Sequence, residues 1–315
     1  MKPIVFMYSG QGAQYFHMGK ELFDKEPAFK QALLACDDIV RGEIGTSLVD
    51  VMYDPGKKKS EPFDRLEHTH PGCFMIGHAM GRLLRSKGIQ PQYVMGYSLG
   101  EWNAAVDAGV MELGAVLRSL IQQAKLFMEV APEAGMTAIL ADPAIMQERP
   151  DLFQDSWLGG VNFPNHFCIT ARPERLDLIE QRLTAEDVIC QRLPVHRGFH
   201  SPLVEMGKER YLANCPPTKF PSLPFYSGVA GGSVDLPDPV HFWRACREPV
   251  MFNQTAAAME RQGAMRYVDL GPSGTLANFV KYGLSPQSQS ETFTILTPFG
   301  RETNMLQKAL TGLRG

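Results

Sequence analysis

The pentapeptide Gly96-Tyr97-Ser98-Leu99-Gly100 constrains the fold of this chain more than any other stretch. Its pattern, Gly-x-Ser-x-Gly, is typical of a sharp turn between a parallel strand and a helix, at which the serine hydroxyl is exposed. An apolar run at 93–95 precedes the pentapeptide and helical spacing over 99–108 follows it, as this turn requires. We therefore predict a nucleophilic Ser98 at the edge of a parallel sheet. The alternative is an ordinary turn in which the serine caps a helix.

The composition limits the class of protein. The chain has 315 residues, 44% hydrophobic and 21% charged, which suits one large soluble domain or two moderate ones. No apolar run has transmembrane length, the N-terminus lacks a signal-peptide cleavage site, and the net charge of −3 argues against general nucleic-acid binding. The six scattered cysteines indicate a reduced, cytoplasmic protein. His196 and His200 are four residues apart but lack an HExxH pattern, so we expect no metal.

The pattern of expected elements changes after residue 132. Strands are expected at 136–140, 157–162, 166–170 and 188–193, with helices at 144–153 and 175–183. The order βαββαβ is typical of a ferredoxin-like unit. We therefore expect an α/β fold in which residues 133–198 form a small inserted subdomain, and residues 1–132 and 199–315 form the catalytic large subdomain around a parallel sheet.

A glycine-rich turn, Ser9-Gly10-Gln11-Gly12, directly follows the first expected strand at 4–8. The turn has neither GxGxxG nor the lysine of a phosphate-binding loop, so its backbone N–H groups have another expected use. An oxyanion hole needs two donors, and the Gly-x-Ser-x-Gly turn supplies only the N–H of Leu99. The glycine-rich turn is a candidate for the second donor.

A serine hydroxyl is a poor nucleophile near neutral pH unless a base, usually histidine, takes its proton. The chain has eight histidines, and their spacing alone does not select one. His200 is favoured because it lies where the small subdomain is expected to rejoin the large one, and sites often form at such junctions.

Several further motifs occur in a fixed order along the chain. They are Tyr8-Ser9-Gly10-Gln11-Gly12-Ala13-Gln14, Glu101 directly after the pentapeptide, Gly198-Phe199-His200-Ser201-Pro202, Pro249-Val250 and Leu270-Gly271-Pro272-Ser273. With these motifs the chain resembles, nearly end to end, the malonyl-CoA:acyl carrier protein transacylase family, which includes the acyltransferase domains of polyketide synthases. The fold implied by this resemblance is an α/β-hydrolase-like subdomain with an inserted ferredoxin-like one.

The resemblance also implies roles for individual residues. Ser98 is the acylated nucleophile and His200 its base, and the backbone N–H groups of Gln11 and Leu99 form the oxyanion hole. A backbone carbonyl orients the histidine, by position that of Ala245. No cofactor is bound; the substrates are thioesters on the phosphopantetheine of an acyl carrier protein, or on coenzyme A, and the expected protein partner is an acyl carrier protein.

The chain departs from the family at the position that recognises malonate. Malonyl-specific members carry an arginine in the helix after the pentapeptide, where a guanidinium pairs with the malonyl carboxylate. Here Gln123, or Ala124 if the alignment is shifted by one, takes that position.

Four other residues are expected to bind substrate, and they differ in how well they match the family. His70 replaces a common glutamine, and Arg197 and Phe199 stand in Arg-Gly-Phe where malonyl-selective members have His-Ala-Phe. Asn162 matches the family, and with Gln123 these residues complete the expected substrate-binding set.

A glutamine does not offset the several kcal/mol needed to bury an unpaired carboxylate. We therefore predict acyl groups without a carboxylate, and the chain resembles the subset of the family that hydrolyses stalled acyl groups from carrier proteins in polyketide biosynthesis. One alternative is transfer of a neutral acyl group to a carrier protein. A second is malonyl transfer with Arg197 as the carboxylate partner, and a third is a non-catalytic protein that binds a carrier protein.

Overall fold

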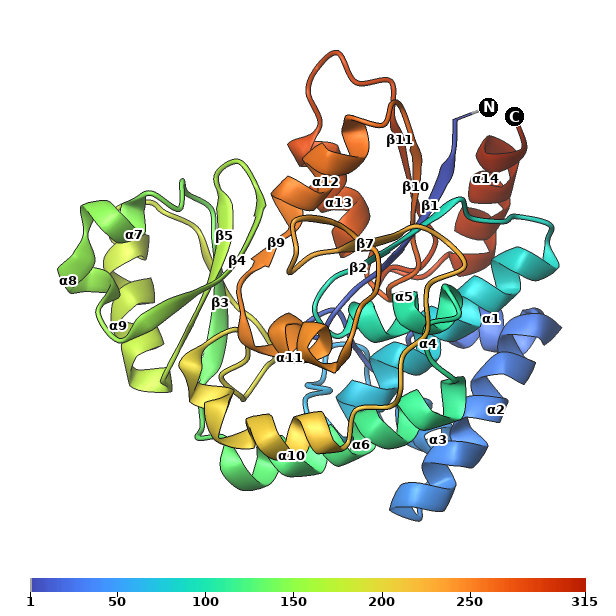
Figure 1. Cartoon of the computed structure of the whole chain (residues 1–315), viewed down its shortest axis with the longest axis horizontal. Helices are drawn as coiled ribbons and strands as arrows, with labels where there is room; N and C mark the ends of the chain where they lie inside the picture. Colours follow the sequence, from blue (N-terminus) through green and yellow to red (C-terminus); the bar gives the residue numbers. More distant parts are fainter. Residues whose placement is uncertain (1) are drawn as a thin grey trace.

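The computed structural model describes residues 2–315, which form two unequal parts, each built around a sheet (Figure 1). The sheet of the large part has six strands in the order β11-β10-β1-β2-β7-β8. Their bounds are β1 Ile4–Tyr8, β2 Tyr93–Gly96, β7 Phe225–Ser227, β8 Gly232–Val234, β10 Arg266–Asp269 and β11 Glu291–Thr294. The first five in this order are parallel and only β8 is antiparallel, which agrees with the α/β fold expected from the sequence.

Strand β1 lies in the middle of the large sheet because both of its faces are apolar. All five of its residues are buried, between β10 on one side and β2 on the other. A parallel sheet covered on both faces favours such continuous apolar runs over alternation. Neighbouring parallel strands end at the same edge, so the turns after β1 and β2 lie side by side: Tyr97 N–H donates to Tyr8 O at 3.0 Å.

Helices cover both faces of the large sheet, and α2, α4 and α6 pack together on one side (Figure 1). The helices of this part are α1 Lys20–Lys25, α2 Pro27–Ile44, α3 Leu48–Met52, α4 Leu66–Ser86, α5 Gly100–Asp107, α6 Leu113–Val130, the 3₁₀ helix η1 Pro202–Gly207, α10 Lys208–Ala213, α11 Pro239–Arg247, α12 Phe252–Glu260, α13 Thr275–Gly283 and α14 Glu302–Arg314. Because β2 ends at Gly96 and α5 starts at Gly100, the Gly-x-Ser-x-Gly turn lies at the carboxyl end of the large sheet, beside the turn after β1.

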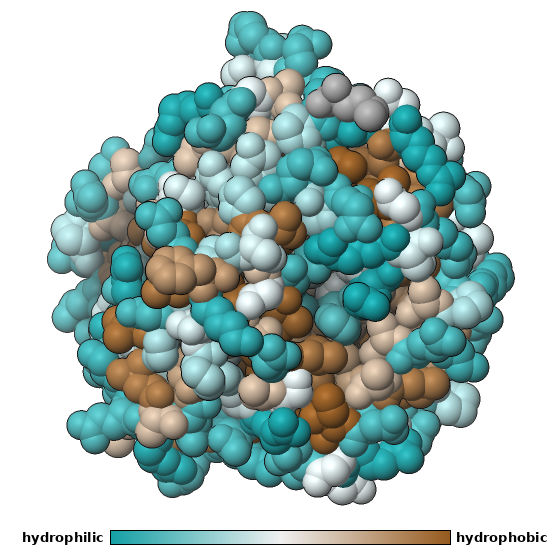
Figure 2. Space-filling view, turned by 45° about the vertical axis from the view of Figure 1, so that its right-hand side comes forward, coloured by the Kyte–Doolittle hydropathy of each residue, from teal (hydrophilic) through white to brown (hydrophobic). Residues whose placement is uncertain are grey.

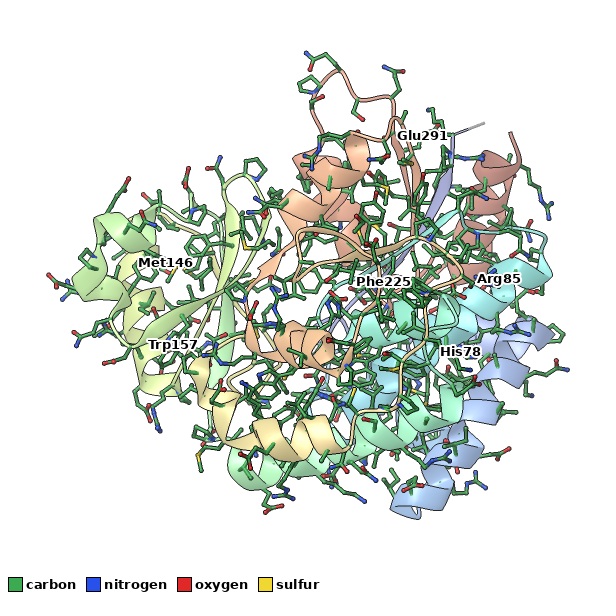
Figure 3. The ribbon with its side chains drawn as sticks, in the orientation of Figure 1. His78, Arg85, Met146, Trp157, Phe225 and Glu291 are labelled. Carbon is green, nitrogen blue, oxygen red and sulfur yellow. The ribbon has the colours of Figure 1, made fainter. Side chains whose placement is uncertain are left out.

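The small part is green to yellow in Figure 1 apart from the orange β9, and it carries a sheet in the order β6-β3-β5-β4-β9. Its elements are β3 Gly135–Ile139, α7 Ile145–Glu148, α8 Pro150–Phe153, β4 Ser156–Phe163, β5 His166–Ala171, α9 Pro173–Thr184, β6 Cys190–Arg192 and β9 Val250–Met251. The first four strands in the sheet order are antiparallel neighbours, which is the ferredoxin-like arrangement expected from the βαββαβ order. Met146 and Trp157 mark this part in Figure 3, and Phe225 marks the large sheet.

Two details of the small part differ from the sequence-based expectation. The single helix expected at 144–153 is two short helices, because Pro150 lacks an N–H and Arg149 before it is non-helical, with φ −127° and ψ 59°. The strand β9 comes from outside residues 133–198 and pairs in parallel with β4, Gly160 opposite Val250. The subdomain boundaries at 132/133 and 198/199 stay a prediction.

Hydrophilic side chains predominate on the face drawn in Figure 2, and hydrophobic ones lie mainly in recesses between them. Within residues 2–315, no helix is both long enough and apolar enough to cross a membrane.

We expect Gly100→Ala to destabilise the fold strongly. A Cβ at Gly100 would lie 1.9 Å from the carbonyl oxygen of Tyr8, and this atom belongs to the central strand and has no room to move. The expected loss is at least about 3 kcal/mol of unfolding free energy, measured by denaturant unfolding or seen as loss of soluble protein. Gly42→Ala is the control, since a Cβ there meets nothing within 4 Å. It should be neutral or stabilising, and equal losses in both variants would contradict the close approach.

Candidate active site

Ser98 lies at the tip of the turn between β2 and α5 in a strained backbone conformation. Its φ of 54° is in the left-handed region, which few non-glycine residues adopt. The flanking glycines are sterically required, since a Cβ at Gly96 would lie 2.5 Å from the Cα of Glu101. These features match the serine-exposing turn predicted from the pentapeptide.

The hydroxyl of Ser98 contacts His200, as expected from the sequence. The Oγ of Ser98 lies 2.8 Å from Nε2 of His200, and Nδ1 of His200 lies 2.8 Å from the backbone oxygen of Glu248. A carbonyl oxygen only accepts hydrogen bonds, so Nδ1 carries the proton and Nε2 presents its lone pair to the serine. The three groups therefore form a chain in which Nε2 is free to accept the Ser98 proton.

His200 is held by its own backbone as well as by its ring. Its N–H donates to Cys246 O at 2.8 Å, and its φ is 58°, a second left-handed non-glycine residue in the same site. Burial lowers the pKa of the His200 imidazole to about 4, while the hydrogen bond to Glu248 O acts in the opposite direction. The imidazole is therefore neutral at physiological pH, the form that a general base needs.

Two backbone N–H groups are available beside Ser98. Among residues 2–315, neither the Gln11 N–H nor the Leu99 N–H has an acceptor within hydrogen-bonding distance. Both residues line the same cavity as Ser98, Leu99 from the start of α5 and Gln11 from the turn after β1. The Gln11 side chain is anchored to α4, where its Nε2 donates to Thr69 Oγ1 at 2.7 Å. This arrangement suits an oxyanion held between two donors.

The cavity that contains Ser98 is small, with a volume of about 20 Å³. Its lining residues are Gln11, His70, Ser98, Leu99, Trp102, Gln123, Phe199, Tyr211, Ala245 and Cys246. Aromatic rings make up much of this wall, and the set includes neither lysine nor arginine. A volume of this size holds about one water molecule or a methyl group.

Comparison with known proteins identifies the family. A family profile described as "Acyl transferase domain" matches residues 5–314. The chain is 39% identical over 307 residues to the polyketide biosynthesis acyltransferase homolog PksD of Bacillus subtilis (strain 168), covering 97% of this chain and 95% of that protein. The chain belongs to the acyl transferase family.

Two further acyl transferase relatives agree with this assignment. BaeD, a polyketide biosynthesis acyltransferase homolog of Bacillus velezensis, is 39% identical over 310 residues, which are 98% of this chain and 95% of the relative. The structure of a loading acyltransferase from the avermectin modular polyketide synthase superposes with a TM-score of 0.91 at 25% identity, over 99% of this chain and 100% of that one. The chain thus spans 95% to 100% of the length of these acyl transferase family members.

Three of the predicted substrate-binding residues line the cavity of this acyl transferase. Gln123 is 2% exposed, and its Nε2 donates to Ser119 Oγ at 3.2 Å. His70 packs beside Phe199, with ring centroids 5.6 Å apart, and its Nδ1 is buried with no hydrogen-bond partner among residues 2–315. Burial lowers the pKa of His70 to about 3, so its imidazole is neutral.

The other two predicted substrate-binding residues lie outside this cavity. Arg197 lines a neighbouring cavity of about 260 Å³, which shares Gln11 with the Ser98 cavity. Its guanidinium donates to the backbone oxygens of Phe127 at 3.1 Å and His196 at 2.8 Å. Asn162 lies on β4, where its Oδ1 accepts a hydrogen bond from the Tyr97 hydroxyl, with the two oxygens 2.9 Å apart. Asn162 therefore supports the residue before Ser98, and Arg197 has carbonyl partners of its own.

The carbonyl that orients His200 lies three residues later in the chain than the sequence predicts. The structure shows Glu248 O, not Ala245 O, on Nδ1 of His200, so the assignment to Ala245 is wrong. Helix α11 ends at Arg247, and the extended backbone of Glu248, with φ −95° and ψ 158°, turns its carbonyl out of the helix. Ala245 still lines the cavity, but its carbonyl belongs to the last turn of the helix.

Sequence reasoning also missed Trp102 and Tyr211, which form part of the cavity wall. Trp102 packs against Phe242 with ring centroids 4.6 Å apart, and the Tyr211 ring centroid lies 6.3 Å from that of Trp102. Helical spacing indicates only that Trp102, four residues after Ser98, lies about one helical turn beyond it. No sequence signal brings Tyr211, on the distant helix α10, to the same place.

The low pKa of His200 predicts an unusual pH profile. We expect the rate constant for labelling of Ser98 by a fluorophosphonate to show no fall near the ordinary histidine pKa of about 6.5. It should fall only as the pH drops through about 4, where the imidazole takes up a proton.

The stability of the fold must be measured at each pH, because both the labelling rate and the unfolding free energy are expected to fall as the pH is lowered. His70 and His200 have lowered pKa values in the fold, so the unfolded chain binds more protons below about pH 6.5. The unfolding free energy therefore decreases as the pH falls from that value. Circular dichroism at each pH identifies the range in which the protein is folded. A labelling rate that halves near pH 6.5 in fully folded protein would contradict the prediction.

Proposed function

We propose that this protein hydrolyses small, uncharged acyl groups from acyl carrier proteins through an acyl-Ser98 intermediate. The observation that carries the proposal is that, among residues 2–315, no lysine or arginine lines the Ser98 cavity. Its polar side chains include Gln123, an amide, and His70, whose low pKa keeps it neutral. A buried malonyl carboxylate would have no charged partner there, and such a group costs several kcal/mol.

In the proposed first step, the Oγ of Ser98 attacks the thioester carbonyl and His200 Nε2 takes the hydroxyl proton. The Glu248 carbonyl stabilises the resulting imidazolium through Nδ1–H, and the N–H groups of Gln11 and Leu99 bind the oxyanion. The carbon–sulfur bond breaks, His200 returns the proton to the departing thiolate, and the acyl group remains on Ser98.

In the proposed second step, water replaces the thiol. His200 removes a proton from the water as its oxygen attacks the ester carbonyl, and the same two N–H groups hold the oxyanion. The ester bond to Ser98 breaks, Ser98 recovers its proton from His200, and a free carboxylic acid leaves. The cavity volume of about 20 Å³ supports a short acyl group such as acetyl.

Transfer to a second carrier protein is the competing function. The names of PksD and BaeD, polyketide biosynthesis acyltransferase homologs, favour it. Transfer and hydrolysis share the acyl-enzyme and differ only in the acceptor that removes the acyl group.

Intact-mass measurement tests both the acyl group and the acceptor. The protein is mixed with acetyl-loaded or malonyl-loaded carrier protein, with and without an unloaded carrier of different mass. We expect acetyl release as free acetate, at a rate that the second carrier leaves nearly unchanged. Fast malonyl movement to the second carrier with slow acetyl release would overturn the proposal. Fast acetyl movement to the second carrier would establish transfer instead.

A further inference from the structure

Helix α11 sets the position of His200 through its C-terminal end. The carbonyl of Cys246 accepts the His200 N–H, and the carbonyl of Glu248, the residue directly after the helix, accepts Nδ1–H, both at 2.8 Å. A shift of α11 would therefore move both the backbone and the ring of His200 relative to Ser98.

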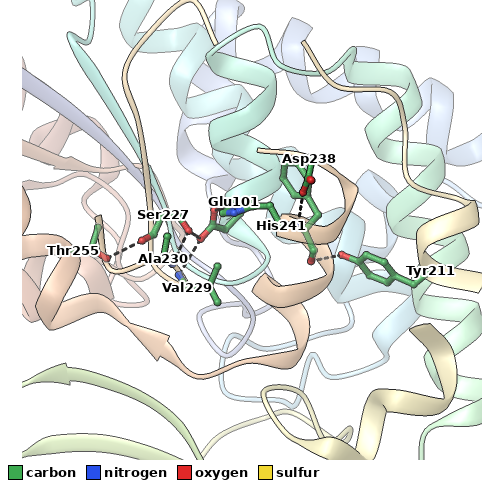
Figure 4. A network of polar contacts seen from close by, with 9 residues as sticks. Glu101, Tyr211, Ser227, Val229, Ala230, Asp238, His241 and Thr255 are labelled. Atoms are coloured by element: carbon green, nitrogen blue, oxygen red, sulfur yellow. Dashed lines mark hydrogen bonds and ion pairs between the residues drawn. The ribbon is translucent and has the colours of Figure 1, made fainter. Parts of the chain in front are cut away.

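The N-terminal half of α11 is tied to the helix that follows Ser98. Nε2 of His241, on α11, lies 2.9 Å from Oε2 of Glu101, on the first turn of α5 (Figure 4). Glu101 is fully buried and His241 is 6% exposed. The Glu101 N–H donates to the Ser98 carbonyl at 3.0 Å, so this carboxylate is attached to the serine turn itself.

The second carboxylate oxygen of Glu101 accepts hydrogen bonds from the residue that ends β7 and from one that follows it. Oε1 accepts the hydroxyl of Ser227 at 2.7 Å and the N–H of Val229 at 3.3 Å, where the chain leaves β7 (Figure 4). The carboxylate thus joins α5, the end of β7 and α11. Since replacing both partners of a buried hydrogen bond with apolar groups of similar shape is often nearly neutral or stabilising, stability alone does not account for such a network.

We propose that the Glu101–His241 pair is a positioning device that sets α11, and through it His200, at the correct place relative to Ser98. Neither residue lines the Ser98 cavity. The pair acts by keeping Nε2 of His200 at 2.8 Å from Oγ of Ser98, within the narrow range over which a base accepts a proton. The proposal rests on the roles proposed for Ser98 and His200, and is independent of the acyl group and of the final acceptor.

The test measures the rate constant for fluorophosphonate labelling of Ser98, which needs no acyl substrate. Replacing His241 with phenylalanine removes the hydrogen bond and keeps a ring against Phe225 and Phe242, which now flank the imidazole. We expect His241→Phe to slow labelling about 100-fold, as a misplacement of the base by about 1 Å would. His241→Gln, whose amide N–H is able to donate to Glu101, should restore a large part of the rate. If His241→Phe does not fold, His241→Leu takes its place and is expected to slow labelling to a similar extent, because leucine also lacks a donor for Glu101.

Repeating the substitution in a His200→Ala variant distinguishes loss of positioning from structural damage around Ser98. In His200→Ala protein, labelling no longer depends on the place of the base, so adding His241→Phe should lower the rate no further. Thr255→Val is the matched control: Thr255 is equally buried and donates to Ser227 O at 2.9 Å in the same network, but it is not on α5 or α11 (Figure 4). It should lose stability and keep the wild-type labelling rate.

The outcomes distinguish this inference from the proposed function. A wild-type protein that does not label at Ser98 would overturn the proposed function. A wild type that labels, with His241→Phe labelling equally fast, would overturn the positioning role alone. An equal fall of the rate in the wild-type and His200→Ala backgrounds would also overturn it, because that pattern indicates structural damage.

Discussion

Ser98→Ala protein is expected to form no acyl-enzyme and to lose turnover by a factor on the order of 10³ to 10⁶. The substitution removes the oxygen that lies 2.8 Å from His200 Nε2 and leaves the neighbouring N–H donors in place. Alanine also finds the φ of 54° at this position unfavourable, so thermal unfolding is measured in parallel. The decisive measurement is intact mass after mixing with acetyl-loaded carrier protein, in which wild type should gain one acetyl group.

His200→Ala should reduce acyl-enzyme formation nearly as much, and the double variant Ser98→Ala/His200→Ala should be no slower than Ser98→Ala. Residues that act as one unit have strongly non-additive effects. Ser86→Ala is the control, because the Ser86 hydroxyl donates to Leu83 O on α4 at 2.7 Å and Ser86 lies outside the Ser98 cavity. An acylated Ser98→Ala protein would show that another nucleophile carries the acyl group.

The parts of the site that could be predicted from the sequence are those encoded locally. The turn around Ser98 needs glycines at two fixed positions, because Gly96 and Gly100 pack against the backbones of Glu101 and Tyr8. The small subdomain was equally predictable, since alternation of strands and helices with a short hairpin between β4 and β5 fixes the order of its elements.

The parts that could not be predicted depend on backbone groups or distant contacts. Any residue has a carbonyl, so nothing in the side chain of Glu248 marks it as the partner of His200. The strand β9 has only two residues, and its pairing with β4 depends on where the chain returns in three dimensions. Arg197 was a reasonable candidate by its distance of three residues from His200. The tertiary structure turns its guanidinium toward Phe127 O instead.

Gln123→Arg tests whether the missing cation determines acyl selectivity. Gln123 is buried in the wall of the Ser98 cavity, and a guanidinium there would offer two parallel N–H groups to a malonyl carboxylate. We expect the malonyl-to-acetyl ratio of acylation rates to rise about 100-fold, equivalent to about 3 kcal/mol. Because the cavity is only about 20 Å³, the arginine is also introduced together with Trp102→Leu, which removes part of an aromatic wall.

Gln123→Arg is also expected to lower stability, and comparison with Gln123→Met separates the effect of charge from that of size. Without malonate the new guanidinium is a buried charge lacking a partner, so the unfolding free energy should fall by about 3 to 5 kcal/mol. Gln123→Met, similar in length and uncharged, should change neither the malonyl-to-acetyl ratio nor the stability by a comparable amount. If wild type already accepts malonyl as fast as acetyl, the neutral cavity does not exclude the carboxylate. Arg197→Ala then becomes the next measurement, since Arg197 is the nearest arginine in sequence to His200. Its guanidinium now donates to the backbone oxygens of Phe127 and His196, outside the Ser98 cavity.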